Sequence, residues 1–398
     1  MFKSLEKKYF DIPLSRGFVS LYTGRTISLI SGALLGLFLP IFLYNLFDQN
    51  FQAVVVYYTI GFFLFGITIA FGAGFLNKFG FRRALQVSVI LAALFYTIFY
   101  FISQDNLIYL IPLSIITLVL FRLFHWLPYH VDFAKFTTKE TRARQVSMLS
   151  ATRMILGVFI PIISGFIIIR FGFDVLFLIA IILWLVSGIP YLTLPRTEEK
   201  FSWSLKKTWQ EFFSKERRKM VLVYVADGAE NMVGLLVWPI FIFQVLKGNY
   251  FQVGAISTLI IGFTVALQLV MGKVIDGKVS KKKVLKWGTL FYSLGWVIKI
   301  FVSTAFQIFI AGAYHSAAYI LLRTPFDTLT YEIAADQGHY IDEFTVLREM
   351  ALQLGRLIMA ILIIIISLFF AIQWIFALAA FASIIFNLLE QREVRLGM

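Results

Sequence analysis

Long apolar runs separated by short polar segments dominate the pattern of this 398-residue chain. A helix needs about 20 mostly apolar residues to cross the hydrocarbon core of a bilayer, and the runs here have that length. The pattern predicts an all-α polytopic membrane protein with twelve transmembrane helices. They are expected at residues 18–46, 53–76, 84–103, 107–134, 143–169, 173–194, 220–246, 251–272, 285–304, 306–331, 344–371 and 373–390.

One long polar segment, residues 196–219, interrupts the apolar pattern near the middle of the chain, with six runs on each side. Eight of its residues are Lys or Arg, while Leu205, Trp209, Phe212 and Phe213 recur at helical spacing. This composition is typical of a short basic helix that lies along a membrane surface, and a solvated linker is the alternative. The expected parts are a bundle at 1–195, a cytoplasmic linker at 196–219 and a second bundle at 220–398.

The basic residues indicate the orientation of the chain in the membrane. If the N-terminus is cytoplasmic, the loops on that side hold 27 of the 36 Lys and Arg residues, and the outer loops hold only Arg170 and Lys247. Cytoplasmic loops carry such an excess, so we expect both termini in the cytoplasm and the chain in the plasma membrane. The segment 332–343 is acidic where a basic loop is expected, and it could pair with the basic linker.

Composition excludes several classes of function. The chain is 60% hydrophobic and 15% charged, far from the range of soluble domains. It has no cysteine, which excludes disulfides, thiolate zinc sites and cysteine nucleophiles. The net charge of +14 is accounted for by loops, so we expect the lipid bilayer and not nucleic acid as the partner. No P-loop, metal-binding His pair or G-x-S-x-G motif is present, so we expect neither an enzyme nor a cofactor or metal.

The two halves repeat each other at a spacing of about 199 residues, which is typical of transporters built from two parallel repeats. Proline, glycine and Phe-Gln positions recur in the same order on corresponding helices. The matching positions are Pro40 and Pro239, Phe51-Gln52 and Phe251-Gln252, Pro128 and Pro325, and Gly157 and Gly355.

Twelve spans, a 6+6 arrangement and a basic central loop resemble the major facilitator superfamily over the whole chain. That family joins its second and third helices, and its eighth and ninth, by the motif G-x-L-x-D-R-x-G-R-K. The second copy here, GKVIDGKVSKKK, keeps Asp276, whereas the first, AGFLNKFGFRR, keeps Arg82 and Arg83 but has Asn77 in place of the acid. The resemblance implies that Asp276 latches the outward-facing state. Both segments could instead be tight basic turns.

Ionisable residues inside the spans are candidates for function, because a charge at the bilayer centre costs about 3 kcal/mol or more. They are concentrated on the first, fourth, fifth, seventh, tenth and eleventh spans, and the ninth has Lys299 alone. The resemblance implies that these six spans line or wall a central cavity. Arg25 lies about two turns from the cytoplasmic end of its span, so we expect its side chain to snorkel to the interface.

On the seventh span, Asp227, Glu230 and Asn231 are expected to share a face. Two carboxylates three residues apart cannot both be charged cheaply in an apolar medium, so one is expected to hold a proton. On the tenth span, Arg323 and Asp327 can pair within the helix, as a structural pair or a cytoplasmic gate.

These patterns give three sets of candidate residues. For substrate binding we expect Arg122, His125, Tyr129, Arg153, Asn231, His315, Tyr319 and Arg356. For proton coupling we expect Asp227, Glu230 and Glu349. For gating we expect Asp276, Arg82, Arg83, Asp132, Arg323 and Asp327. The alternative is a structural role, with the carboxylates of the seventh span in a static pair with Arg122 or Arg356.

The resemblance implies a secondary active transporter, and we expect it to be a monomer. Both signs of charge in the expected cavity predict that its substrate is a small polar anionic or zwitterionic solute. Titratable acids in the cavity favour a proton gradient as the drive. A drug or lipid exporter of the same fold, with phenylalanines lining an apolar cavity, is the first alternative. A membrane sensor that binds without transport is the second.

Overall fold

A computed structural model describes residues 14–136, 142–196, 201–275, 281–336 and 341–389. Helices make up the secondary structure of these residues, and no β-strand occurs among them. The elements are α2 Arg16–Gly36, α3 Leu39–Leu46, α4 Phe51–Phe79, α5 Phe81–Phe101, η1 Gln104–Asn106, α6 Leu107–Phe136, α7 Arg142–Tyr191, α8 Leu205–Phe212, α9 Arg218–Met232, η2 Val233–Val237, α10 Trp238–Val245, α11 Tyr250–Ile275, α12 Lys281–Ile300, α13 Ala305–Asp336, α14 Ile341–Phe369, η4 Ile372–Trp374, α15 Ile375–Ile384 and η5 Ile385–Leu388.

Local chemistry sets several of these boundaries. The Asn50 side chain accepts a hydrogen bond from the backbone N–H of Ala53 at 3.0 Å and so caps the start of α4. Gly80 ends α4 at φ 90° and Gly172 bends α7 at φ 81°, conformations that glycine adopts without a steric penalty. The long element α7 is therefore two helices, which correspond to the fifth and sixth expected spans.

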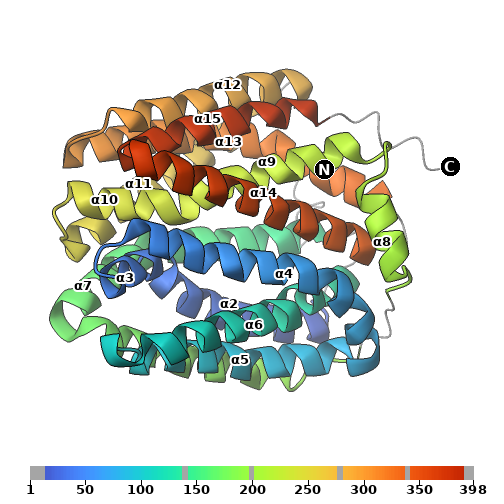
Figure 1. Cartoon of the computed structure of the whole chain (residues 1–398). Coiled ribbons are helices and arrows are strands. Elements are labelled where there is room, and N and C mark those ends of the chain that lie inside the picture. Colours follow the sequence, from blue (N-terminus) through green and yellow to red (C-terminus); the bar gives the residue numbers. More distant parts are fainter. Residues whose placement is uncertain (1–13, 137–141, 197–200, 276–280, 337–340, 390–398) are drawn as a thin grey trace, which may run out of the picture.

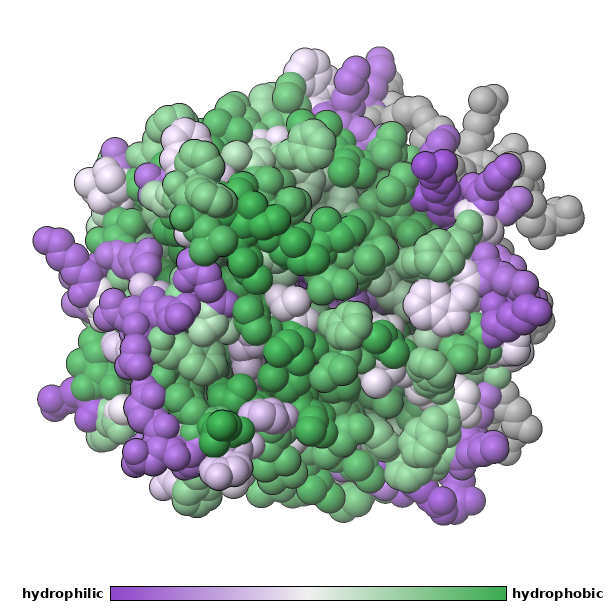
Figure 2. Space-filling view, in the orientation of Figure 1, coloured by the Kyte–Doolittle hydropathy of each residue, from purple (hydrophilic) through white to green (hydrophobic). Residues whose placement is uncertain are grey.

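The helices run between two ends of the molecule (Figure 1). The short linker helix α8 lies across one of them, here called the linker end, and the bend of α7 with α3 and α10 lies at the opposite end. A broad band of hydrophobic side chains covers the face seen in Figure 2, and hydrophilic residues gather toward its two ends. This distribution fits a protein whose middle faces lipid.

Nine described helices are long and apolar enough to cross a membrane, and they cover ten of the twelve expected segments because α7 holds two. The other two segments are α12, which carries Lys283, Lys286 and Lys299, and the short apolar stretch Ile372–Leu388. The helical polytopic fold is confirmed. For these two segments a complete span stays a prediction.

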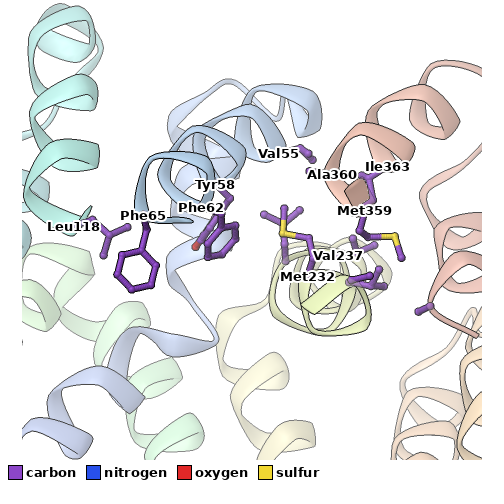
Figure 3. Packing of buried hydrophobic residues seen from close by; sticks show 14 of the residues in the cluster. Val55, Tyr58, Phe62, Phe65, Leu118, Met232, Val237, Met359, Ala360 and Ile363 are labelled. Atoms are coloured by element: carbon purple, nitrogen blue, oxygen red, sulfur yellow. The ribbon is translucent and has the colours of Figure 1, made fainter. Parts of the chain in front are cut away.

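Two close helix contacts join the halves of the chain: α4 packs against α14, and α7 packs against α11. The α7–α11 contact depends on glycine, because a Cβ at Gly165 would lie 2.6 Å from the carbonyl oxygen of Tyr250. Phe62 and Phe65 of α4 belong to one continuous buried cluster with Met232 of α9 (Figure 3). The halves therefore share a hydrophobic core.

Hydrogen bonds between the halves close the opposite end. Asn45 Nδ2 donates to the hydroxyl of Tyr250 at 2.6 Å, and Gln244 Nε2 donates to the hydroxyl of Tyr44 at 2.8 Å. Asn45 and Gln244 occupy corresponding places in the two repeats, near the ends of α3 and α10.

Candidate functional site

A cavity of about 1410 Å³ lies between the two halves. It reaches from Leu39 of α3 and Tyr57 of α4 to Phe133, Val146 and Phe344, which lie in the last or first turns of their helices at the linker end. Because hydrogen bonds bridge the opposite end, the cavity runs toward the linker end. A cavity between two halves of a protein is a usual place for a small-molecule site.

The charged residues that line the cavity leave an excess of positive charge. Arginines outnumber carboxylates six to three, which gives a formal charge of +3. Low-dielectric walls focus the field of such a cluster and attract anions. These residues are Arg25, Arg122, Arg153, Arg323, Arg348 and Arg356, with Asp227, Asp327 and Glu349.

Arg122 of α6 and Arg356 of α14 meet over one aromatic ring. Their guanidinium carbons lie 4.8 and 4.7 Å from the centroid of the Phe62 ring. Cation–π attraction holds each cation there, although the two charges repel each other. Nη1 of Arg122 is buried and has no hydrogen-bond partner among the described residues. The pair thus brings one arginine from each half to the ring of Phe62. One N–H donor group of the pair, Nη1 of Arg122, has no hydrogen-bond acceptor in the described part of the chain.

Arg356 is held in place by a chain of polar side chains on its own helix and on α9. It donates to Gln353 Oε1 at 3.0 Å and to Asn231 Oδ1 at 2.9 Å. Gln353 Nε2 in turn donates to Glu349 Oε2 at 3.2 Å. The acid and base of the eleventh expected span are therefore connected through the amide between them.

Asp227 of α9 forms a shorter ion pair with Arg323 than Asp327 does, among the described residues that line the cavity. Two nitrogens of Arg323 approach its two oxygens at 2.7 and 3.3 Å, and the carboxylate is buried. Arg323 lies farther from Asp327, at 3.7 Å. Sequence spacing predicted the pair within α13, but the shorter contact joins α9 to α13.

Glu230 does not share the cavity with Asp227, which corrects the expectation of a common face. Its carboxylate accepts a 2.6 Å hydrogen bond from the hydroxyl of Tyr292 on α12. Residues three apart on a helix differ in direction by about 60°, which is enough to turn one toward the cavity and the other toward a neighbouring helix. His315 is likewise buried between α12 and α13, with its ring centroid 4.2 Å from that of Tyr292, and does not line the cavity.

Lys299 lies on the same side of α12 as Tyr292, in the last turn of the helix. Its ammonium nitrogen is 3.9 Å from the ring centroid of Trp296 and 4.2 Å from that of Trp238, and the residue is buried. Together with Glu230 and His315 these residues form a buried polar cluster within the C-terminal half, behind the cavity wall.

In the N-terminal half, too, the residues that line the cavity differ from those expected. His125 is fully buried and lies behind the cavity wall, where its Nε2 is 3.2 Å from Arg25 Nη1 and its Nδ1 is 3.1 Å from Ser88 Oγ. Tyr129 also lies outside the cavity lining. Arg25 was expected to snorkel, but it is buried, lines the cavity and lies 5.0 Å from the Trp126 ring centroid.

A sequence model described as the Major Facilitator Superfamily matches residues 21–226, which is more than half of the chain. The chain belongs to the Major Facilitator Superfamily. A relative from Bacillus subtilis (strain 168), the uncharacterized protein YqgE, is 25% identical over 244 residues. These residues are 59% of this chain and 56% of the relative, so the match spans little more than half of that protein.

Solved structures of transporters share the fold. The peptide transporter POT in complex with sulfate is 10% identical, with a TM-score of 0.70, and the match covers 96% of both chains. A mutant of POT in complex with alafosfalin is also 10% identical, with a TM-score of 0.68 over 94% of this chain and 93% of that one. At this identity the likeness is one of fold. Superfamily membership and the apolar helices make the chain a multi-pass integral membrane protein from a family of transporters.

In the superfamily motif after the second span, the residue at the position of the acid contacts the linker. Asn77 of α4 binds the backbone of the linker: its Oδ1 accepts from Phe201 N at 2.8 Å and its Nδ2 donates to Phe201 O at 2.7 Å. Arg82 donates to the carbonyl oxygen of Leu192, and Arg83 is exposed. Asp276 lies outside the described residues.

The remaining gating candidates have different surroundings. Asp132 of α6 is fully buried and does not line the cavity, whereas Asp327 does. Glu343, at the edge of the acidic segment 332–343, accepts hydrogen bonds from the backbone N–H and the hydroxyl of Ser202 in the linker, at 2.8 and 2.5 Å. One residue of that segment therefore contacts the linker, through a serine, and the suggested pairing with the basic residues of the linker stays a prediction.

Five of the predicted substrate-binding residues line the cavity. Two further residues, which were not predicted from the sequence, also line it. Arg122, Arg153, Asn231, Tyr319 and Arg356 are in the lining. Arg348 and His130 are also in the lining. A four-residue periodicity on α14 was the available signal for Arg348, because every fourth residue from Phe344 to Arg356 lines the cavity.

Proposed function

We propose that this chain is a secondary active transporter that moves a small anionic or zwitterionic solute by alternating access. The observation that carries the proposal is the pair of Arg122 and Arg356 over Phe62, with one donor of Arg122 unused. A buried guanidinium without a partner is costly, and a bound carboxylate or phosphate group would satisfy it. Because the two arginines come from different halves, the anion would bridge the parts that must move.

In the proposed mechanism residues 1–195 and 220–398 rock as two bundles about this site. The positive-inside pattern supports a plasma-membrane protein with its linker end in the cytoplasm, and in this proposal the cavity would face inward. The bonds of Tyr44 and Asn45 to the second half would then hold the outer gate closed. An outward-facing state requires these bonds to break and the linker end to close.

Proton coupling is the proposed drive, with Asp227, Glu230 and Glu349 as the carriers. Glu349 and Asp227 face the cavity, and Glu230 lies behind it within reach of a hydroxyl of Tyr292. Protonation of Asp227 would release Arg323, which supports a link between proton binding and the cavity charge. Arg153, Asn231 and Tyr319 would contact the substrate around the arginine pair.

The test is binding and transport by the purified full chain in proteoliposomes. A thermal-shift panel of acetate, lactate, inorganic phosphate, glutamate and alanine should raise the melting temperature for anions, because a ligand that binds only the folded state stabilises it. Radiolabelled uptake of the best ligand should be lost in Arg122→Gln. Arg170→Gln, at an exposed position of α7 two residues before its bend at the opposite end, is the matched control and should transport normally. Equal uptake by both variants would contradict the proposal.

A further inference from the structure

The two walls of the cavity have different chemistry. Of the 20 lining residues from the N-terminal half, nine are aromatic and three are charged. Of the 14 from the C-terminal half, two are aromatic and six are charged. One wall is therefore mainly apolar and the other mainly ionic.

The apolar wall, formed mainly by α4, α5 and α6, presents ring faces and aliphatic carbons. Tyr57 and Phe62 of α4, Phe95 of α5, and Leu118 and Phe121 of α6 are among its members. The hydroxyl of Tyr57 is engaged with Ser114 Oγ at 3.2 Å, so that residue offers mainly its ring to the cavity. Phe65 of α4 and Leu118 lie next to each other in Figure 3 and continue the same surface.

The ionic wall holds three carboxylates and three arginines, so its formal charges balance, and Arg122 adds a positive charge from the apolar wall. Asp227 is paired with Arg323, and Glu349 accepts a hydrogen bond from Gln353. The buried donor of Arg122 is unused. An anionic group is therefore best placed at the ring of Phe62, where the apolar and ionic walls meet.

We propose that the substrate is an amphiphilic anion, with its charged group at Arg122 and Arg356 and an aromatic or aliphatic body against the apolar wall. This inference rests on the proposed function and narrows its substrate class. A small hydrophilic anion would leave the apolar wall in contact with water. A ligand with an apolar body would remove from water both the surface of that wall and the surface of the body itself. The cavity volume exceeds the range of about 300–1,000 Å³ usual for small-ligand pockets, so such a body has room.

Three matched probes test the inference on the purified full chain by isothermal titration calorimetry: 2-naphthoate, acetate and the neutral 2-naphthamide. We expect naphthoate to bind at least tenfold more tightly than acetate, because of the ring, and at least tenfold more tightly than naphthamide, because of the charge. Equal affinities for acetate and naphthoate would overturn the inference. If acetate still binds and Arg122→Gln abolishes its binding, the proposed function survives that result. If no anion binds, the proposed function fails as well.

Variants locate the body of the ligand. Phe121→Ser should lower the affinity for naphthoate about tenfold and leave that for acetate within twofold. The ratio of the two affinities, measured on one preparation, does not depend on the fraction of folded protein. Phe101→Ser, at an exposed position at the end of α5, is the control and should leave the ratio unchanged. An unchanged ratio in Phe121→Ser would contradict the placement of the body on this wall.

The same chemistry occurs in soluble aromatic acids and in single-chain anionic lipids. Competition separates these sources: lysophosphatidate is added to the chain in nanodiscs that hold bound naphthoate. Displacement of naphthoate by about one lysophosphatidate per chain would support an amphiphile from the membrane as the substrate. Retention of naphthoate would support a water-soluble one. If neither compound binds while acetate does, the amphiphile class is wrong.

Discussion

Asn77 of α4 holds the backbone of Phe201 in the linker through two reciprocal hydrogen bonds, at 2.8 and 2.7 Å. The next linker residue, Ser202, is bound by Glu343 of α14. The linker therefore connects α4 of one half to α14 of the other at the linker end. An aspartate at position 77, as the family motif has, could accept from Phe201 but could not donate to it.

Asn77→Asp should loosen the linker. The substitution removes one hydrogen bond and places a carboxylate against a carbonyl oxygen, which together should cost about 1–3 kcal/mol. Limited proteolysis would show this as faster cleavage within residues 201–204. Lys78→Ala, at an exposed neighbouring position, is the control and should leave the cleavage rate unchanged. Equal cleavage of Asn77→Asp and the unmodified chain would show that these bonds do not hold the linker.

Gly228→Ala should destabilise the chain, because a Cβ at Gly228 would overlap the carbonyl oxygen of Leu352 on α14. Gly234, six residues later in the π-helix η2, has its nearest neighbour for a Cβ at 3.8 Å. Overpacking against a backbone costs about 1–3 kcal/mol, so the melting temperature of Gly228→Ala should fall while that of Gly234→Ala should not. Matched thermal unfolding in one detergent measures both. A similar melting temperature for both variants would exclude close packing at Gly228.

This glycine contact also explains why the site could be predicted only in part. The spans could be predicted from the length of the apolar runs. The ionisable residues on α6, α9, α13 and α14 could be predicted as functional candidates because a charge in the membrane is costly. Which of them face the cavity depends on how each helix is rotated about its axis. For α9 that rotation is set by the approach of Gly228 to α14, which directs Asp227 to the cavity and Glu230 to α12.

The pairing of ionic groups was equally hidden in the sequence. Spacing on one helix suggested Arg323 with Asp327, but the shorter contact is to Asp227, 96 residues away. A pair on different helices leaves no periodic signal in one chain. His125 shows the same limit, because the polar neighbours that enclose it, Arg25 and Ser88, lie on other helices.

Asp227→Asn should destabilise the chain more than Asp227→Asn combined with Arg323→Gln. The single change leaves a buried guanidinium short of its main partner, which typically costs about 3–5 kcal/mol, and the double change removes both charges. The side chains of this pair are only 4% and 24% exposed. Thermal unfolding of the two single variants and the double variant gives the coupling. Additive effects would contradict a direct interaction.

The surface pair of Glu211 and Arg217 in the linker region is the matched control for that experiment. Its nitrogen–oxygen distance is 2.9 Å, but the two side chains are 30% and 22% exposed. Solvent screens such a pair, so Glu211→Gln should cost less than about 1 kcal/mol. A loss as large as that of Asp227→Asn would show that burial does not decide the difference.

Glu230→Gln should separate proton coupling from substrate exchange. Glu230 lies outside the cavity lining, so exchange of labelled for unlabelled anion across the membrane should continue, whereas accumulation driven by a pH gradient should be lost. Tyr292→Phe removes the 2.6 Å hydrogen bond to this carboxylate and should shift the pH dependence of uptake. Tyr314→Phe is the control on α13. Loss of both exchange and accumulation in Glu230→Gln would place this carboxylate in the substrate site instead.

Removal of the bonds at the opposite end should open the cavity on that side. Tyr44→Phe with Asn45→Ala deletes the two hydrogen bonds between the halves there. At about 0.5–1.5 kcal/mol each, their loss should raise the outward-facing population roughly tenfold. The natural absence of cysteine lets Leu39→Cys, in the cavity lining, serve as a single labelling site.

Labelling of Leu39→Cys by an impermeant maleimide added outside proteoliposomes of defined orientation measures that opening. The rate should rise about tenfold in the Tyr44→Phe, Asn45→Ala background, because the cavity then spends more time open to the reagent. Tyr109→Phe removes a hydroxyl at an exposed position at the same end and should leave the rate unchanged. If the labelling rate stays the same in all three backgrounds, these hydrogen bonds do not hold the gate, and the hydrophobic contacts of Tyr250 with Phe38, Phe173 and Phe243 become the groups to weaken next.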